Sequence, residues 1–367
     1  MKFLLTALPI GLSGLIAQAL LLRELLISFY GNELTLGIIL ANWIVSEALG
    51  VLIFGKMADR LKNKISVFVT LQILFSLFLP ISIYLSRTYK ALIGVPFGVG
   101  IGLPTLFLVS LFVIFPVGFC HGGLFSSISK IASLRAKDAT SSIGKVYAWE
   151  AFGTLIGGLV FTFFLISRIH SFQIVFFIIL LNLFICLFFF GKINKGLQAV
   201  LLCVFCLILA LYFRPGINFF QRDSINKQWR QKQSLVLDYH NSIYGNITVT
   251  KELEQFTFFY NGLPVISAPY PDKAFVEDFG NFPLLFSPRP DRVLVVSAGA
   301  GGLIHEILKH PVQRIDYAEI DPLLIQMLKK YPTPLTASEL NDPKVRVIPR
   351  DGRFFLKATK EAYDVIL

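Results

Sequence analysis

The first 213 residues contain seven apolar runs, and this pattern limits the possible fold more than any other feature of the sequence. The runs lie near residues 3–22, 34–54, 65–86, 101–125, 146–167, 171–190 and 197–213. A helix needs roughly 20 apolar residues to cross the hydrocarbon layer of a membrane, so the last run is marginal in length. The first run is longer than the ~7–15 apolar residues of a cleaved signal peptide. We therefore predict a transmembrane helical bundle of six or seven spans over residues 1–213, surrounded by a lipid bilayer.

The distribution of charge fits a membrane bundle. The chain is 54% hydrophobic and carries a net charge of +11. Residues 1–213 hold 15 Lys and Arg but 6 Asp and Glu, whereas residues 214–367 hold 19 and 17. Basic residues in short loops mark the cytoplasmic side of a membrane, and here they lie near residues 56–64, 130–145 and 192–195. The basic excess is thus a topology signal that puts the N-terminus inside, and it does not indicate nucleic-acid binding.

The side of the C-terminal half depends on the number of spans. Seven crossings from an inside N-terminus would leave residues 214–367 outside, away from cytosolic cofactors. We expect a cytoplasmic C-terminal domain on chemical grounds, so either the marginal seventh run does not cross or the count is wrong by one. The predicted regions are a bundle at 1–213, a juxtamembrane linker at 214–233, a small β unit with a connecting helix at 234–290, and an α/β domain at 291–367.

Several ionisable or amide residues lie in or at the edge of the apolar runs, and they are Gln18, Arg23, Glu24, Asn42, Glu47, Glu150 and Asn182. Charges at membrane depth are costly, so they usually face a bundle interior or a cavity. One interpretation pairs Arg23 with Glu24 near the interface and hydrogen-bonds Glu47 and Glu150 between helices. The other interpretation puts Glu47 and Glu150 in a polar cavity, as a transporter would require.

The four cysteines do not indicate a metal site. Cys120, Cys186, Cys203 and Cys206 all lie in apolar segments, and Cys203 with Cys206 has no second pair to complete a zinc site. The five histidines form no cluster in the sequence either. We therefore predict buried thiols, because free Cys packs as a small hydrophobic residue, and no metal cofactor.

Runs of β-forming residues follow the basic, amphipathic linker. They are SLVLDYH, SIYGNITVTKE, QFTFFYNG and LPVISAPY, and Asn261-Gly262 is a strong hairpin signal. We predict a small antiparallel β unit over these residues. Residues 272–287 are expected to be helical and to end before Pro288.

Residues 292–321 have the pattern of a strand, a glycine-rich turn, a helix and a second strand. The corresponding segments are RVLVVS, AGAGG, LIHEILKH and QRIDYA. This order forms the first half of a nucleotide-binding βαβ unit. Glycines in the turn let backbone N–H groups approach a ligand at the positive end of the helix. The candidate binding residues of this turn are Ser297, Gly299, Gly301 and Gly302.

Acidic residues follow the next two predicted strands. Glu319 lies 20 residues after Gly299, where a carboxylate can accept both hydroxyls of a ribose; the alternative is an ordinary polar strand end. Asp351 and Gly352 follow the strand VRVIP, where they can bind an adenine amine and a ring nitrogen; the alternative is a helix N-cap. An N-cap explains Asp321, which precedes a proline. Ligands of open α/β sheets bind at the carboxyl edge, so these elements together are more specific than any one alone.

The motifs resemble two known families. GKMADRLKNK at residues 55–64 is similar to a cytoplasmic loop of major facilitator transporters, with Lys62 where that motif has glycine. RVLVVSAGAGG, EILKHP, DPKVRVIPRDGRFFL and YDVIL, together with residues 319–322, resemble spermidine synthases, polyamine aminopropyltransferases with a methyltransferase-like fold. With GKVYAWEAFGTLIGG, the chain resembles bacterial inner-membrane proteins in which a helical bundle is fused to a spermidine synthase-like domain. The implied fold is a polytopic α-helical membrane domain plus a Rossmann-like α/β domain.

The resemblance also implies ligand contacts and a catalytic base. Positions equivalent to Gly299 and Gly301 line decarboxylated S-adenosylmethionine, that of Glu319 holds the ribose, and those of Asp351 and Gly352 hold the adenine. The family's catalytic Asp follows the strand that ends YDVIL here, so the equivalent residue would come after Leu367. An α/β sheet of four parallel strands would be incomplete, and we therefore expect the α/β domain to be truncated.

The chain departs from the family pattern around the amine substrate. Ala300 stands where family members commonly have Asp, and Gly245 replaces a Gln. Val276, Glu277 and Asp278 correspond to a Tyr-His-Glu cluster that shapes the amine site. Glu277 and Asp278 are candidate substrate-binding residues because they could attract a cation; the alternative is a solvated helix face.

These observations predict a membrane-anchored transferase that moves an aminopropyl group from decarboxylated S-adenosylmethionine to a small-molecule amine. One alternative is a transporter or sensor of a polyamine or small solute with a catalytically inactive nucleoside-binding domain. Another is an S-adenosylmethionine-dependent methyltransferase. A NAD-type Rossmann enzyme is disfavoured because Ile304 replaces the third glycine of the dinucleotide fingerprint. The acceptor amine and the oligomeric state are left open.

Overall fold

The computed structural model describes residues 6–60, 63–96, 98–189, 195–213, 216–229 and 234–367. The chain forms two compact units, Met1–Arg230 and Gln231–Leu367. The predicted linker, 214–233, lies partly outside the described residues. Its described part forms helix α9 (Gly216–Gln228), which belongs to the first unit. Lys62 and Lys192, which contributed to the topology prediction, also lie outside the described residues.

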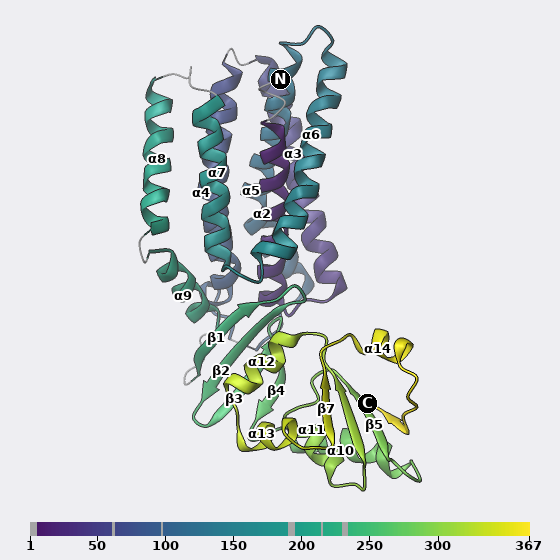
Figure 1. Ribbon diagram of the computed structural model, residues 1–367. Helices are drawn as coiled ribbons and strands as arrows, with labels where there is room; N and C mark the ends of the chain where they lie inside the picture. The colour runs from purple at the N-terminus through teal and green to yellow at the C-terminus, as the bar shows by residue number, and fades with distance from the viewer. Residues whose placement is uncertain (1–5, 61–62, 97, 190–194, 214–215, 230–233) are drawn as a thin grey trace. The chain divides into compact units, whose positions relative to one another are not determined.

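The first unit is a bundle of long helices (Figure 1). The helices that precede α9 are α2 (Ala7–Phe29), α3 (Glu33–Arg60), α4 (Lys64–Leu92), α5 (Leu103–Ser133), α6 (Ala139–Val160), α7 (Ser171–Phe189) and α8 (Lys195–Phe213). Helix α6 continues as one π-helical segment, Phe161–Leu165. Leu20, Phe75 and Val117 are fully buried between these helices, whereas Phe112 and Phe164 are largely exposed. Apolar side chains therefore cover the outside of the bundle as well as its core, as expected for helices that face lipid.

Five helices in the described part of the chain are long and apolar enough to cross a membrane. They are Ala7–Phe29, Glu33–Ala58, Lys64–Leu92, Leu103–Ser133 and Ala139–Leu165. A sixth candidate joins Gln198–Leu211 to Gly216–Gln228, and this pair bends by 72°. The run predicted at 171–190 gives a shorter apolar helix, Ser171–Leu187. The count is thus five, or six with the bent pair, against a prediction of six or seven. It rests on length and composition alone, and insertion into a bilayer stays a prediction.

Glycines bring α2 and α6 into backbone contact. A Cβ atom added to Gly11 would lie 2.0 Å from the carbonyl oxygen of Glu150, and one added to Gly153 would lie 1.9 Å from that of Leu8. Because no side chain fits at either position, small residues set the spacing between these two helices. The Glu150 side chain accepts a hydrogen bond from Thr154 Oγ1 of its own helix at 3.3 Å.

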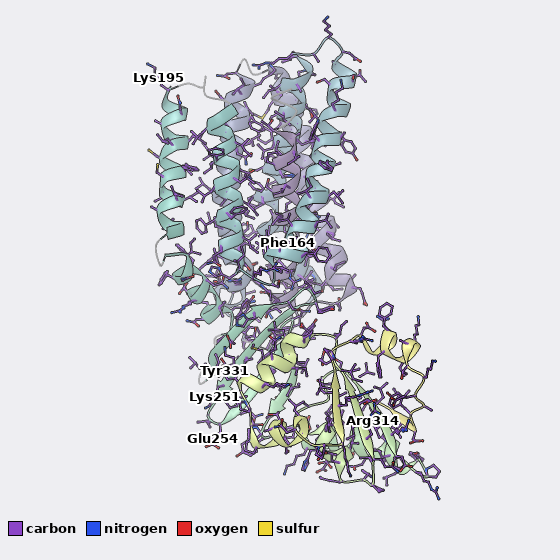
Figure 2. The ribbon with its side chains drawn as sticks, in the orientation of Figure 1. Phe164, Lys195, Lys251, Glu254, Arg314 and Tyr331 are labelled. Atoms are coloured by element: carbon purple, nitrogen blue, oxygen red, sulfur yellow. The ribbon has the colours of Figure 1, made fainter. Side chains whose placement is uncertain are left out.

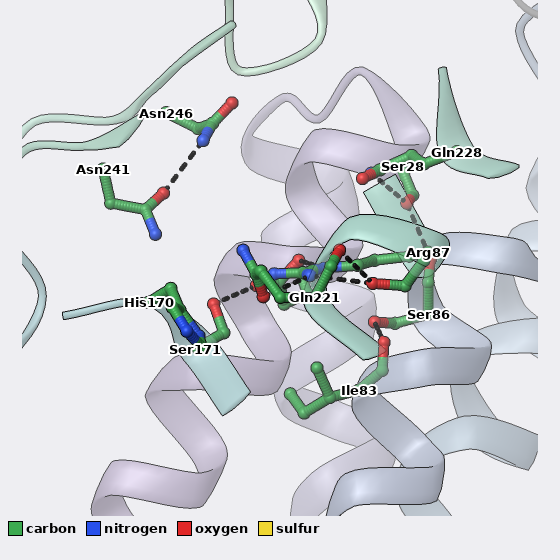
Figure 3. A network of polar contacts seen from close by, with 12 residues as sticks. Ser28, Ile83, Ser86, Arg87, His170, Ser171, Gln221, Gln228, Asn241 and Asn246 are labelled. Carbon is green, nitrogen blue, oxygen red and sulfur yellow. Dashed lines mark hydrogen bonds and ion pairs between the residues drawn. The ribbon is translucent and has the colours of Figure 1, made fainter. Parts of the chain in front are cut away.

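A buried ion pair between Arg87 and Glu24 lies at the centre of a polar network (Figure 3). Arg87 is 1% exposed and donates from Nε to Glu24 Oε2 at 2.7 Å and from Nη2 to Oε1 at 2.6 Å. Its Nη1 donates to Gln221 Oε1 at 2.8 Å and to Ser224 Oγ at 3.0 Å on α9. Ser171 Oγ on α7 donates to Glu24 Oε1 at 2.5 Å. The network therefore connects α2, α4, α7 and α9, through an arginine that the sequence did not single out.

We predict that Arg87→Met destabilises the helical unit by about 3–5 kcal/mol, because it leaves the Glu24 carboxylate buried without its cation. The double variant Arg87→Met, Glu24→Met should recover part of this loss, because no unpaired charge then stays buried. Thermal unfolding of the full chain in detergent measures both. Arg168→Met, which changes an exposed arginine of the same unit, is the control and should cost about 0.5 kcal/mol or less. Equal losses for Arg87→Met and Arg168→Met would contradict the buried-charge argument.

The second unit begins with an antiparallel sheet. Its strands, β1 (Leu235–Asn241), β2 (Asn246–Glu252), β3 (Gln255–Tyr260) and β4 (Leu263–Ala268), pair in chain order. Asn261 and Gly262 join β3 to β4 with φ values of 48° and 85°. A two-residue hairpin of this kind requires left-handed backbone at both positions, which Asn and Gly tolerate. The predicted β unit and its hairpin are therefore confirmed.

Helix α10 (Lys273–Leu285) confirms the helix predicted at 272–287. A parallel sheet follows this helix. The spatial order is β7 (Val345–Ile348), β6 (Arg314–Ala318), β5 (Arg292–Val296) and β8 (Val365–Ile366). The helices between these strands are α11 (Leu303–Leu308), α12 (Pro322–Lys330), α13 (Pro334–Leu340) and α14 (Gly352–Ala358). Val296 pairs with Ala318, and Ala318 pairs with Ile348. The carboxyl ends of β5, β6 and β7 are thus level, and the residues that follow them meet at one edge.

Asp316 in the middle of β6 is fully buried and is held by three donors. Arg314, labelled in Figure 2, and Arg346 each make two hydrogen bonds to its carboxylate, at 2.9 to 3.1 Å. Tyr363 Oη donates to Asp316 Oδ2 at 2.6 Å. Burial alone would raise the pKa of Asp316, but these three donors outweigh it and hold the pKa below its usual value. The cluster joins β6 and β7 to the segment before β8.

A carboxyl group whose pKa is lower in the folded state than in the unfolded chain, about 3.9 for Asp, adds to the free energy of unfolding. This contribution is present above the pKa of the unfolded chain and is lost as pH falls through the pKa of the folded state. We therefore predict that the thermal midpoint of the second unit drops below about pH 4 in the wild type. Asp316→Asn should reduce this acid dependence, to which Asp238 and Glu306 also contribute through lowered pKa values. It should cost about 2 kcal/mol at neutral pH, because the arginines are partly exposed. Thermal unfolding from pH 2 to pH 7 measures this, with the exposed Asp278→Asn as control. An unchanged acid dependence in Asp316→Asn would contradict it.

Candidate functional site

The loop from Ser297 to Gly302 has an unusual backbone. Ser297 and Ala298 have φ values of 68° and 48°, and Gly301 and Gly302 have 94° and 118°. Left-handed backbone costs a non-glycine residue of order 1–3 kcal/mol, and such strain is most often found at ligand sites. Ser297 N–H donates to the carbonyl oxygen of Ala318 at 2.9 Å, which ties the loop to the end of β6. The loop is therefore held in a strained shape at the carboxyl edge of the sheet.

A buried carboxylate holds the other end of this loop. Glu339 on α13 is 0% exposed, and its oxygens accept from the N–H groups of Gly301 at 2.6 Å, Gly302 at 2.7 Å and His305 at 3.0 Å. Burial raises the pKa of Glu339, although the three N–H groups oppose this. The sequence led us to expect these N–H groups to face a ligand. Instead they bind a carboxylate of the chain, because a negative charge at the start of α11 meets otherwise unpaired donors.

A pocket of about 510 Å³ lies against the outer side of the loop. Its walls come from β4, from α10 and from the end of β5. Its lining residues include Ser267, Phe275, Val276, Phe279, Ser297, Ala298, Ala300, Gly301 and Leu367. Gly301 is required here, since a Cβ atom would lie 2.6 Å from Ile266 Cγ2. The pocket is therefore largely apolar, with hydroxyl and backbone groups of the loop on one side.

Glu319 lies next to the loop, as the sequence predicted. It is 2% exposed, and its Oε2 accepts from Ala298 N–H and from Tyr317 Oη, both at 3.0 Å. Its Oε1 accepts from Asp321 N–H at 3.2 Å. Burial and the negative charge of Glu319 keep the pKa of Tyr317 well above its usual value, so Tyr317 stays a donor. A carboxylate has about four acceptor directions, so three of those of Glu319 are occupied and about one is open, and a contact with a ribose stays a prediction.

Asp351 and Gly352 follow β7 at the same edge. Asp351 Oδ1 caps α14, accepting from Arg353 N–H at 2.8 Å and Phe354 N–H at 3.1 Å. The N-cap that the sequence left as an alternative is therefore present, and a role in adenine binding stays a prediction. Gly352 is buried, and a Cβ atom there would lie 2.5 Å from Val296 Cγ1. Asp321 caps α12 by accepting from Leu323 N–H at 3.0 Å, as expected.

Glu277 and Asp278, the candidate substrate residues, lie on the exposed face of α10 and do not line the pocket. The pocket wall from this helix consists of Phe275, Val276 and Phe279. The two phenylalanine rings stack with centroids 5.4 Å apart and planes 10° apart. Sequence reasoning did not single out this pair, although aromatic residues four apart on a helix lie on one face.

Comparisons with known proteins support the resemblance of this unit to spermidine synthases. Residues 272–367 match the spermine/spermidine synthase domain family. The polyamine aminopropyltransferase of Korarchaeum cryptofilum (strain OPF8) is 29% identical over 134 residues, 36% of this chain and 41% of that protein. The enzyme of the same name from Alkaliphilus oremlandii (strain OhILAs) is 40% identical over 76 residues, 20% of this chain and 26% of that protein.

A solved spermidine synthase from Thermotoga maritima aligns with a TM-score of 0.33 and 24% identity, over 36% of this chain and 45% of that one. A score this low does not by itself define a fold. The alignments span less than half the length of these relatives. The C-terminal unit is thus similar to polyamine aminopropyltransferases, and the family match does not extend to the helical unit.

We predict that Glu339→Gln destabilises the glycine loop by about 2–4 kcal/mol. An amide replaces one acceptor oxygen with a donor, so at least one of the three N–H groups loses a charge-assisted hydrogen bond. Hydrogen exchange of the Gly301, Gly302 and His305 amides in the full chain measures the effect. Glu277→Gln makes the same chemical change at an exposed position and is the control. Unchanged exchange at the three amides would show that Glu339 does not hold the loop.

Proposed function

We propose that the chain is a membrane-anchored transferase that moves an aminopropyl group from decarboxylated S-adenosylmethionine to a small-molecule amine. The observation that carries this proposal is the match of residues 272–367 to the spermine/spermidine synthase domain, which includes the strained loop, Glu319 and Asp351. The pocket beside the loop supports it, since a sulfonium donor and an acceptor must meet in one cleft. The curated relatives named above carry the name polyamine aminopropyltransferase.

The proposed reaction forms one bond and breaks one. The nitrogen of the acceptor amine attacks the aminopropyl carbon next to sulfur, and the carbon–sulfur electron pair leaves with sulfur, giving neutral methylthioadenosine. The new ammonium group loses a proton to a carboxylate base, which in the resembling family follows the strand equivalent to β8. The chain's own contribution is to orient the donor, with Glu319 on the ribose and the loop from Ser297 to Gly301 beside the reacting centre.

The apolar side of the pocket fits the carbon chains of this reaction. Phe275, Val276, Phe279 and Ala300 offer apolar surface against which an aminopropyl or alkylamine chain can pack. The same surface lacks the acid that related enzymes commonly carry at the position of Ala300. Among the described lining residues the acidic side chain is Asp272, whose Oδ1 accepts from Phe275 N–H at 3.2 Å. Apolar contact would therefore select the carbon chain of the acceptor, and Asp272 offers one negative charge to its amine.

The membrane anchor is part of the proposal and rests on composition. Five helices of the described residues are long and apolar enough to span a bilayer. A bacterial-type inner membrane with the C-terminal unit in the cytoplasm would put that unit in reach of a cytosolic donor. Methyl transfer and a transport or sensing role are the competing functions. The aminopropyl reading is favoured over both because the matched relatives are named for that reaction.

We predict that the full chain binds decarboxylated S-adenosylmethionine and methylthioadenosine in calorimetric titrations, and that Glu319→Gln weakens both by about 10- to 100-fold. The loss corresponds to one charge-assisted hydrogen bond to a ribose hydroxyl, about 1.5–3 kcal/mol. Glu277→Gln, a matched change at an exposed glutamate, should bind as the wild type does. Tighter binding of S-adenosylmethionine than of its decarboxylated form would favour methyl transfer. Equal binding by Glu319→Gln and wild type would contradict the assigned donor site.

A further inference from the structure

A histidine and a glutamate face each other inside the helical unit. His121 on α5 and Glu47 on α3 are separated by 2.7 Å between Nδ1 and Oε1. The second carboxylate oxygen of Glu47, Oε2, accepts from Trp43 Nε1 at 3.1 Å. Both residues lie within helices that are long and apolar enough to span a membrane, where ionisable groups usually have a function beyond packing.

The contact of the second ring nitrogen of His121, Nε2, shows which atoms of the pair must carry hydrogen. His121 Nε2 lies 3.2 Å from the carbonyl oxygen of Ile10 on α2. A carbonyl oxygen can only accept a hydrogen bond, so Nε2 must carry a hydrogen. The contact between Nδ1 and Glu47 Oε1 then needs one further proton, on either the imidazole or the carboxyl group. In both cases the pair holds one proton more than an ionised glutamate beside a neutral histidine.

The surrounding helices fix this geometry. A Cβ atom on Gly14 of α2 would lie 2.0 Å from His121 Nε2, so the ring reaches the α2 backbone only because residue 14 is glycine. From α4, the nearby group is the ring of Phe75, whose centroid is 6.4 Å from that of His121. From α6, Glu150 is close enough to act on His121 electrostatically. Among the described residues that face His121, the titratable groups are thus Glu47 and Glu150.

The two partners differ in access. The side chain of His121 is 6% exposed, whereas that of Glu47 is 32% exposed. Glu47 is therefore the partner closer to the surface of the helical unit, and the polar path from the buried imidazole to that surface runs through its carboxyl group. When the proton leaves, lone pairs of Nδ1 and Oε1 face each other at 2.7 Å and repel, so the contact between α3 and α5 must loosen or the side chains must turn.

We propose that Glu47 and His121 form a proton-binding site in the helical unit, with one exchangeable proton shared between Glu47 Oε1 and His121 Nδ1. The proton is the ligand, and it enters and leaves through Glu47. Its release changes the net charge of the pair from zero to −1 inside an apolar bundle. The helical unit then has a chemistry of its own that is independent of aminopropyl transfer in the second unit.

Histidine ¹⁵N NMR of the full chain tests this proposal, because ¹⁵N shifts report which ring nitrogens carry hydrogen. Comparison with His121→Gln assigns the His121 signals among the five histidines. The expected result is a hydrogen on Nε2 throughout and a single pH-dependent step in the Nδ1 signal, as the proton shared with Glu47 Oε1 is lost. An Nδ1 signal that does not change with pH, or a ring with hydrogen on Nδ1 and none on Nε2, would overturn the proposal.

Variants separate a proton site from a merely structural contact. Glu47→Gln should move the midpoint of the His121 step by about one pH unit or more, a tenfold change in proton affinity. Glu33→Gln, at an exposed position of the same helix, should leave it unchanged. If Glu47→Gln does not fold, Trp43→Phe removes only the donor to Oε2 and should still shift the midpoint measurably. A midpoint that none of these changes moves would mean that Glu47 and His121 do not titrate as a pair.

Discussion

The carboxylate of Glu339, at the start of α11, is the interaction on which the candidate site depends. The carboxylate is fully buried and accepts hydrogen bonds from the N–H groups of Gly301, Gly302 and His305. The loop therefore cannot relax without leaving the buried charge of Glu339 unpaired. With this end fixed, the strained backbone of Ser297 and Ala298 is held against the end of β6. The pocket wall and the neighbourhood of Glu319 follow from that conformation. The carboxylate of Glu339 thus accepts hydrogen bonds from the N–H groups that the sequence suggested would face a ligand.

Local patterns in the sequence were sufficient for much of the second unit. The hairpin at Asn261 and Gly262 depends on backbone freedom that these two residues carry with them. The position of Glu319 beside the loop follows from parallel strands having level carboxyl ends. The caps at Asp321 and Asp351 are likewise local, since each bonds N–H groups two or three residues ahead. Such features need no knowledge of tertiary contacts.

The features that the sequence did not predict depend on residues that are far apart in it. Glu339 meets Gly301 across 38 positions, and Arg87 meets Gln221 across 134. No spacing rule links such pairs, because their contact is created by the packing of whole helices. The bend of 72° between the helical segments Gln198–Leu211 and Gly216–Gln228 was not predicted for a related reason. An apolar run indicates that a helix is favourable in lipid, whereas a bend is decided by what the helix packs against.

Buried ionic groups in this chain fall into two kinds, and the difference separates groups that stabilise the fold from a pair that can exchange a proton. Asp316 is 0% exposed and is saturated by two arginines and a tyrosine, so its lowered pKa keeps it ionised across the neutral range. Arg87 is likewise saturated by Glu24 and the polar groups of α9. Glu47 and His121 differ in two ways. The side chain of Glu47 is about one-third exposed, and the contact between the two residues requires one shared proton that the pair can release. A saturated pair holds a fold in place, whereas a pair that shares one accessible proton can change state.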